Sequence, residues 1–203
     1  MKSRAGFTLT ELLIVIALVS GSAALAAPAI GAAMAERRAS QAHLDVLRIG
    51  RRARSEALAL GRAHLLRFTN ASSPGDHGRV RLYRGTTSSC ATTNWTAVTA
   101  TAECVAPECI DDVNLGDSDY RSSATNFVHM RGSPDNAVID LCYTSSGMMW
   151  HRVSAAAAFS DQNNTNGVSG GYLFTIQRKR SGSFQGVQRS VVFPLGGAPR
   201  TRI

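Results

Sequence analysis

The sequence predicts an α+β fold, in which one long N-terminal helix is followed by an antiparallel two-sheet β-sandwich. The helix is predicted because residues 12–35 carry no formal charge and residues 36–60 repeat apolar side chains at helical spacing. The sandwich is predicted because the apolar period changes to two from residue 62 onward, between frequent turn residues. Many short strands after one long helix favour sheets that pack against that helix.

The first element is expected to be long enough to cross a membrane. At about 1.5 Å per residue the uncharged stretch 12–35 extends ~36 Å, and the hydrocarbon core of a bilayer is ~30 Å thick. Glu11 lies at the edge of this stretch. A carboxylate at mid-membrane depth costs ~2.5–3.5 kcal/mol, so Glu11 is expected to have a functional partner.

The residues around Glu11 form the motif Gly6-Phe7-Thr8-Leu9-Thr10-Glu11, followed by an apolar run. This motif resembles the class III leader of type IV pilins and type II secretion pseudopilins. The resemblance implies that a prepilin peptidase cleaves between Gly6 and Phe7 and methylates the new amino terminus of Phe7. It also implies that Glu11 pairs with a free N-terminal amine during assembly, and that other pilins pack against the N-terminal helix.

Two other interpretations of the N-terminus remain open. An ordinary secretory signal would use Lys2 and Arg4 as its basic region and would be cleaved at the A-x-A site Ala24-Leu25-Ala26. A plain single-pass anchor is the other alternative. Neither gives a role to Gly6-Phe7 or to Glu11, so the pilin resemblance is favoured.

The expected organisation has four parts: a leader at residues 1–6, a transmembrane half-helix at 7–35, an amphipathic half-helix at 36–61 and a sandwich domain at 62–203. The amphipathic half is predicted from apolar residues three or four positions apart, with Gly61 as the stop signal. These residues are Ala42, Val46, Ile49, Ala53, Ala57 and Leu60.

Seven strands are predicted in the sandwich domain from the period-two pattern. Their ranges are 63–69, 79–84, 126–130, 137–143, 148–153, 172–178 and 187–194. Turn signals separate several of them, at 73–76, 132–134, 163–167 and 181–182. Between them, residues 85–124 are rich in Thr, Ser and Asp, and are expected to form a long surface insertion.

The four cysteines all follow the membrane segment, at Cys90, Cys104, Cys109 and Cys142. In an oxidising periplasm they are expected to form disulfides, although the sequence does not choose among the three possible pairings. A bond from Cys90 to Cys104 or Cys109 would staple the insertion as a loop, whereas Cys142 could anchor it to a strand. A metal site is less favoured because no CxxC occurs and the histidines are scattered.

A second resemblance concerns the rest of the chain. Residues 53–62 resemble the junction between the helix and the first strand in the GspH/FimT group of minor pilins and pseudopilins, and residues 189–202 are similar to that group's closing strand and basic C-terminus. The resemblance implies a structural subunit, held in the bacterial inner membrane by one span, with its C-terminal domain in the periplasm and assembled into a pilus or pseudopilus.

The sequence contains no catalytic motif, such as a Gly-x-Ser-x-Gly elbow, a P-loop or HExxH, so we expect neither an enzyme nor a cofactor. The carboxylates Asp111, Asp112, Asp117 and Asp119 are expected to be solvated in a loop, with a structural Ca²⁺ site as the lesser alternative. Asp135 and Asp140 are expected to be isolated.

The alternative function is DNA binding, because some members of the FimT branch bind DNA during uptake through a C-terminal Gly-Arg-x-Arg motif. The corresponding residues here are Gly197-Ala198-Pro199-Arg200-Thr201-Arg202, which keep the arginine pair but insert two residues after the glycine. Arg178, Lys179 and Arg180 are expected at a hairpin tip and would add charge. Such contacts go to phosphates and weaken steeply with salt.

Overall fold

The computed structural model describes residues 8–71, 77–93, 95, 98, 104, 108–133, 135–154, 157–160 and 171–202. Gly6 and Phe7 lie outside the described residues, as do the expected turns at 73–76 and 163–167. The expected turn at 132–134 is wrong for Gly132 and Ser133, which end a strand, and Pro134 lies outside the described residues. The chain divides into two compact units, Met1–Met34 and Ala35–Ile203. We refer to the second unit as the C-terminal domain.

Helix α1 runs from Leu9 to Leu60 and contributes to both units. It ends where Gly61 adopts a positive φ of 63°, a conformation that glycine tolerates without a Cβ clash. Within the C-terminal domain it buries the predicted stripe at Ala42, Val46, Ile49, Ala53 and Ala57. The prediction is wrong for Leu60, which is 51% exposed because the helix ends there, beyond the last helical residue of the core.

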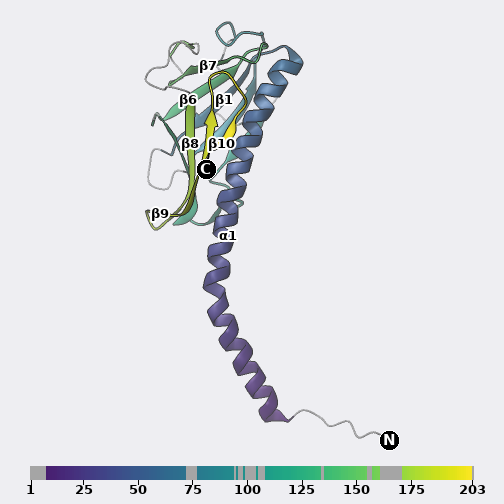
Figure 1. Cartoon of the computed structure of the whole chain (residues 1–203), viewed down its shortest axis with the longest axis vertical. Helices are drawn as coiled ribbons and strands as arrows, with labels where there is room; N and C mark the ends of the chain where they lie inside the picture. The colour runs from purple at the N-terminus through teal and green to yellow at the C-terminus, as the bar shows by residue number, and fades with distance from the viewer. Residues whose placement is uncertain are drawn as a thin grey trace, which may run out of the picture. The chain divides into compact units, whose positions relative to one another are not determined.

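The C-terminal domain contains two five-stranded antiparallel sheets (Figure 1). Sheet A has the order β3-β2-β1-β6-β7. Its strands are β1 (His64–Thr69), β2 (Arg79–Arg84), β3 (Cys109–Asn114), β6 (Val138–Tyr143) and β7 (Met149–Arg152). Sheet B has the order β10-β9-β8-β5-β4. Its strands are β4 (Arg121–Ser123), β5 (Asn126–Ser133), β8 (Tyr172–Arg180), β9 (Ser183–Phe193) and β10 (Arg200–Arg202).

All seven predicted strands are present, with ends that differ by a few residues. Three strands were not predicted: β3, β4 and β10. The expectation of a surface loop at 85–124 is therefore corrected, because this segment supplies an edge strand to each sheet. The adjacent carboxylates Asp111-Asp112 interrupt the apolar alternation of β3, and β4 and β10 have only three residues each.

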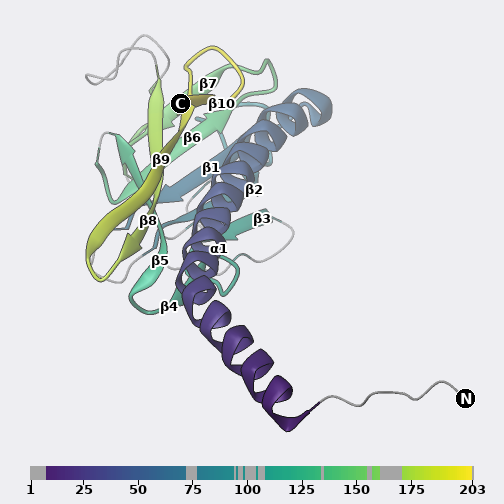
Figure 2. The same cartoon turned by 60° about the horizontal axis from the view of Figure 1, so that its bottom comes forward.

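The main core lies between the second half of α1 and the inner faces of both sheets (Figure 2). Phe68 of β1 stacks on Phe174 of β8 with ring centroids 3.8 Å apart, and Phe193 of β9 meets Phe68 edge-on at 5.1 Å. The helix approaches these rings closely at Gly50, where a Cβ would lie 2.6 Å from Phe193 Cε1. This glycine therefore sets the distance between the helix and sheet B.

A second apolar cluster covers the outer face of sheet A. It joins Leu65, Tyr83 and Cys142 of the sheet to Cys90, Trp95 and Val98 of the following segment. The disulfide Cys90–Cys142 links this segment to β6, which pairs with β1 and β7, and the second disulfide is Cys104–Cys109. Of the alternatives left open by the sequence, the structure has the one in which Cys142 anchors the insertion to the sheet.

Candidate assembly site

Glu11 is held by a reciprocal capping box at the start of α1. Its Oε2 accepts hydrogen bonds from the backbone N–H and the hydroxyl of Thr8, both at 2.9 Å, and its own N–H donates to Thr8 Oγ1 at 3.3 Å. The local sequence Thr-x-x-Glu is the pattern that makes this cap, since each side chain satisfies a backbone N–H that the helix leaves unpaired. Thr8 was not among the predicted site residues, although the Thr-x-x-Glu pattern is sufficient to predict the cap.

The cap places the carboxylate of Glu11 next to the expected cleavage point. The N–H that Glu11 accepts belongs to Thr8, the residue that directly follows Phe7. In the sequence, Thr8 is the residue next to Phe7, whose amino group cleavage at Gly6–Phe7 would free. The geometry therefore suits Glu11 to bind an amine at the start of a helix, where negative charge is also favoured by the helix dipole.

The helical residues after this cap present apolar side chains to their surroundings. Every described side chain up to Met34 is exposed. The larger ones are all more than half exposed up to Ile30: Leu12, Leu13, Ile14, Val15, Ile16, Leu18, Val19, Leu25 and Ile30. One window of α1 has a mean hydropathy of 2.2, so by length and composition this helix can cross a membrane.

The C-terminal arginines lie on β10, at the edge of sheet B. The register pairs Arg200 with Val192, Thr201 with Val191 and Arg202 with Ser190. Paired residues share a face of a sheet, and Val191 belongs to the core. Thr201 therefore faces α1, where its hydroxyl lies 3.1 Å from His43 Nε2, whereas Arg200 and Arg202 face outward and are exposed.

His43 lies in this contact between α1 and the C-terminal strand. Burial lowers its pKa, and the nearby positive charge of Arg189 lowers it further. Neutral His43 is therefore favoured in the folded protein. Arg51 of the same helix adds a longer contact, 3.4 Å from its Nε to the carbonyl oxygen of Pro199. The helix thus fixes the position of β10.

The second group of predicted basic residues lies at the hairpin between β8 and β9, as expected. The turn uses positive φ at Ser181 and Gly182, of 49° and 85°. Arg180 is exposed and Lys179 Nζ lies 5.6 Å from the ring centroid of Phe184. The expectation that all three residues offer charge to phosphates is wrong for Arg178, which is only 8% exposed and donates to Gln185 Oε1 at 2.9 Å.

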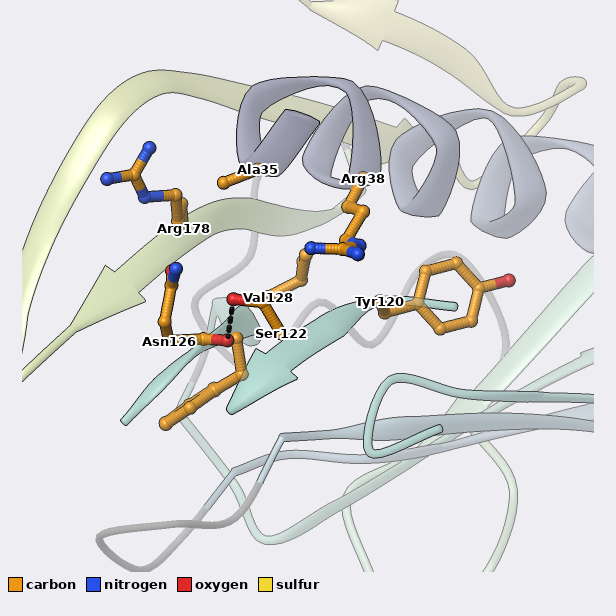
Figure 3. Close-up of a pocket in the computed structure, with 8 residues that line it drawn as sticks. Ala35, Arg38, Tyr120, Ser122, Asn126, Val128 and Arg178 are labelled. Carbon is orange, nitrogen blue, oxygen red and sulfur yellow. Dashed lines mark hydrogen bonds between the residues drawn. The ribbon is translucent and has the colours of Figure 1, made fainter. Parts of the chain in front are cut away.

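Arg178 lines a shallow pocket beneath α1 (Figure 3). Ala35 and Arg38 of α1 line this pocket, together with Tyr120, Ser122 of β4 and three residues of β5. The hydroxyl of Ser122 donates to the carbonyl oxygen of Asn126 at 3.2 Å, the bond drawn in Figure 3. Arg178 is therefore part of the packing between the helix and sheet B, because it lies on the inner face of β8 with Phe174 and Ile176.

The carboxylates expected to be solvated are in part ion-paired. Asp111 accepts from Arg48 at 2.9 Å and from Arg52 at 2.8 Å, which connects β3 to α1, and Asp112 pairs with Arg79. Burial raises the pKa of Asp111, but the bonds from the two arginines outweigh it, so the pKa is lowered overall. Asp117 and Asp119 are exposed in the turn before β4. Among the described residues there is no group of three or more potential metal ligands.

Asp135 and Asp140 are not isolated, which corrects the second expectation about carboxylates. Asp135 forms an exposed ion pair with Arg131. Asp140 is fully buried on β6 and accepts from Arg67 Nε and Nη2, both at 2.8 Å, and from Arg152 Nε at 2.7 Å. Arg67 also donates to the carbonyl oxygen of Val98, in the segment that covers sheet A. This network is structural, because it ties three strands to the covering segment.

Comparison with known proteins gives one match. The family model described as the prokaryotic N-terminal methylation motif matches residues 1–26. No curated protein and no solved structure matches the chain. The matched segment contains the Thr8–Glu11 cap and the first part of the exposed apolar helix. The motif supports a type IV pilin-like precursor of the kind that prepilin peptidase processes, and with the apolar N-terminal helix it suggests membrane anchoring.

Proposed function

We propose that this chain is a minor pilin or type II secretion pseudopilin of the GspH/FimT group, a structural subunit of a pilus or pseudopilus. The observation that carries the proposal is a capped carboxylate, Glu11, at the start of an exposed apolar helix inside a methylation motif. The long helix followed by two antiparallel sheets agrees with the layout that the GspH/FimT resemblance implies.

In this proposal, prepilin peptidase cleaves between Gly6 and Phe7 and methylates the amino group of Phe7. Glu11 then exchanges its bonds to Thr8 for the amine of a neighbouring subunit as the helices of the two subunits pack. Small side chains between Ala23 and Ala33 favour such packing, since they let helix backbones approach closely. The work of the subunit is therefore done by association and not by turnover.

The proposed location is the inner membrane, with the C-terminal domain in the periplasm. Lys2 and Arg4 precede the apolar helix, and positive residues next to a span favour the cytoplasmic side. The two disulfides of the C-terminal domain support the opposite side for the domain, because disulfides persist in the periplasm and are rare in the cytoplasm.

Mass spectrometry of the N-terminus of the membrane-extracted protein tests the proposal. The expected result is a chain that begins at N-methylated Phe7, with Gly6→Leu leaving the precursor uncleaved. A mature chain that begins at residue 27 would support the secretory signal and contradict the proposal. A chain that keeps residues 1–6 in cells with active prepilin peptidase would support a plain anchor.

The alternative function is binding of DNA during uptake. It is favoured by one observation: Arg200 and Arg202 face outward from the same sheet that ends in Lys179 and Arg180. Full-length protein in detergent should then bind DNA with an affinity that falls as salt rises, and Arg200→Ala/Arg202→Ala should remove most of that binding. No retention of DNA at low salt would contradict this alternative and leave the structural proposal intact.

A further inference from the structure

The outer face of sheet B carries an open pocket with about 250 Å³ of free space. Its lining comes from three adjacent strands: His129 and Arg131 of β5, Thr175 and Gln177 of β8, and Phe184 and Gln188 of β9. All six belong to the face opposite the core, because their neighbours in the strands, such as Met130 and Ile176, are core residues. The function proposed above leaves this pocket unused.

The register of sheet B places a cation on each side of the pocket. Arg131 pairs with Thr175, Thr175 with Ser190, and Ser190 with Arg202. Paired residues share a face, so these four side chains form one row across four strands. With strands about 4.8 Å apart, the two guanidinium-bearing residues are about 14 Å apart across the row. Gln188 precedes Ser190 by two residues and therefore lies on the same face, beside this row.

The floor of the pocket offers hydrogen bonds and one aromatic ring. Thr175, Gln177 and Gln188 each both donate and accept, and Gln177 spends one N–H on the carbonyl oxygen of Gly186 at 3.3 Å. Phe184 is 50% exposed, and His129 supports its ring edge-on with centroids 5.2 Å apart. None of the described residues that line the pocket is a carboxylate. Arg131 pairs with Asp135 in an exposed ion pair, so it can exchange partners.

We propose that this pocket binds one ring of an acidic saccharide. The apolar C–H face of the sugar ring lies on Phe184, its hydroxyls bond to Thr175, Gln177 and Gln188, and its carboxylate or sulfate is bound by Arg131 or Arg202. Pockets for drug-sized ligands hold about 300–1,000 Å³ and are mostly apolar. This pocket is smaller, and five of its six described lining residues carry polar groups beside one aromatic ring, which fits a single hydroxylated ring.

The same cations would attract a nucleic acid strand, but the lining favours the saccharide. Strands of nucleic acid bind where successive aromatic rings stack on successive bases. Among the described residues of the outer face, Phe184 is the one large exposed aromatic side chain, whereas Phe193 is fully buried in the core. A single ring surrounded by amides and a hydroxyl matches one sugar unit better than a series of bases.

The test compares three probes on the full-length protein in detergent, by calorimetric titration. They are an oligogalacturonate, the same oligomer with its carboxylates methyl-esterified, and a single-stranded oligonucleotide. The acidic oligomer should bind, and esterification should weaken binding at least about tenfold because charge-assisted hydrogen bonds to the arginines are lost. Binding of the ester as tightly as the acid, or no binding of either, would overturn the proposal.

Variants then locate the binding. Phe184→Ala and Gln188→Ala should each weaken binding of the oligogalacturonate about tenfold or more. Val187→Ala should leave it unchanged, since Val187 is 59% exposed in the same strand but does not line the pocket. Equal affinity of all three variants would overturn the proposal, as would tighter binding of the oligonucleotide with the same dependence on Phe184. Neither outcome affects N-terminal processing, so the assembly proposal is tested separately.

Discussion

The two halves of α1 share one secondary structure and have opposite surroundings. Through Met34 every described side chain is exposed, including Leu12 at 55% and Ile14 at 60%. From Ala35 onward one stripe is fully buried at Ala42, Val46 and Ile49. Burial of apolar surface stabilises by roughly 25 cal/mol per Å². Packing against the domain therefore stabilises the second half of the helix and not the first half.

This difference shows which half of the helix has its partners within the chain. The second half is amphipathic, and polar residues such as Arg48 and Arg52 flank its buried stripe and reach Asp111 on β3. The first half is apolar on all sides, which is typical of a helix surrounded by lipid or by other helices. One continuous helix therefore joins an anchor to a domain core.

The largest effect, on incorporation into filaments, is expected at Glu11. Its described hydrogen bonds are all to Thr8, in the first turn of α1. If the proposed role is right, Glu11→Ala should be processed normally and should be absent from sheared filaments, because the carboxylate proposed to bind the incoming amine is lost. Glu11→Gln separates two roles, since the amide still accepts from Thr8 N–H but carries no charge. Immunoblots of filament and membrane fractions measure both variants. Normal incorporation of Glu11→Gln would show that the cap and not the charge matters.

The contrasting carboxylate is Asp140, whose bonds join β6 to β1 and β7. Asp140→Asn should destabilise the domain by about 3–5 kcal/mol, because Arg67 and Arg152 are left with buried, uncompensated charge. Thermal unfolding of the detergent-solubilised protein measures this loss. Asp135→Asn is the matched control, as its ion pair with Arg131 is exposed and should contribute little. Equal melting temperatures for both variants would contradict a structural role for the network.

Substitution of one glycine in each half of α1 compares how closely the two halves are packed. Gly50→Ala should cost about 1–3 kcal/mol, since its Cβ would lie 2.6 Å from Phe193 Cε1 and 2.9 Å from Pro199 Cγ in the core contact. Gly31→Ala should not destabilise the protein, because nothing lies within 4 Å of its Cβ and alanine is the better helix former. Thermal unfolding again reports both. Destabilisation by Gly31→Ala would show that the first half has packing partners of its own.

Sequence patterns predicted this contrast well, because each half has its own local signal. An uncharged run identified residues 12–35, and spacings of three and four identified Ala42 through Ala57. The same local rules identified seven strands. The Thr-x-x-Glu pattern of the Thr8–Glu11 cap is also local, although the cap was not predicted. Local patterns did not predict strand β3, because Asp111 and Asp112 are typical of a loop. Their partners in the fold, Arg48, Arg52 and Arg79, are distant in the sequence.

Sequence patterns also did not predict that a segment distant in the chain covers the outer face of sheet A. In β1, Arg67 alternates with apolar residues as an outward-facing charge would. It is fully buried because the segment held by Cys90–Cys142 lies over the outer face of sheet A. The pocket on sheet B was missed for a related reason. Its lining residues come from β5, β8 and β9, and only the register brings Arg131 to the same face as Arg202 of β10.

The smallest predicted effect concerns the ion pairs that join the second half of α1 to β3. Because the pKa of Asp111 is lowered in the folded protein, its contribution to stability is present above the unfolded value near 3.8. It is lost as the pH falls through the lower folded value. Asp111→Asn should therefore be less stable than the wild type at pH 6, and this difference should shrink at about pH 3.

Urea unfolding of both proteins at the two pH values measures this difference. His43 also disfavours acid, since burial lowers its pKa, but its effect is shared by wild type and variant. A difference that stays constant from pH 6 to 3 would mean that Asp111 contributes by packing alone. The second half of α1 would then be bound to the domain by its apolar stripe, without electrostatic support from β3.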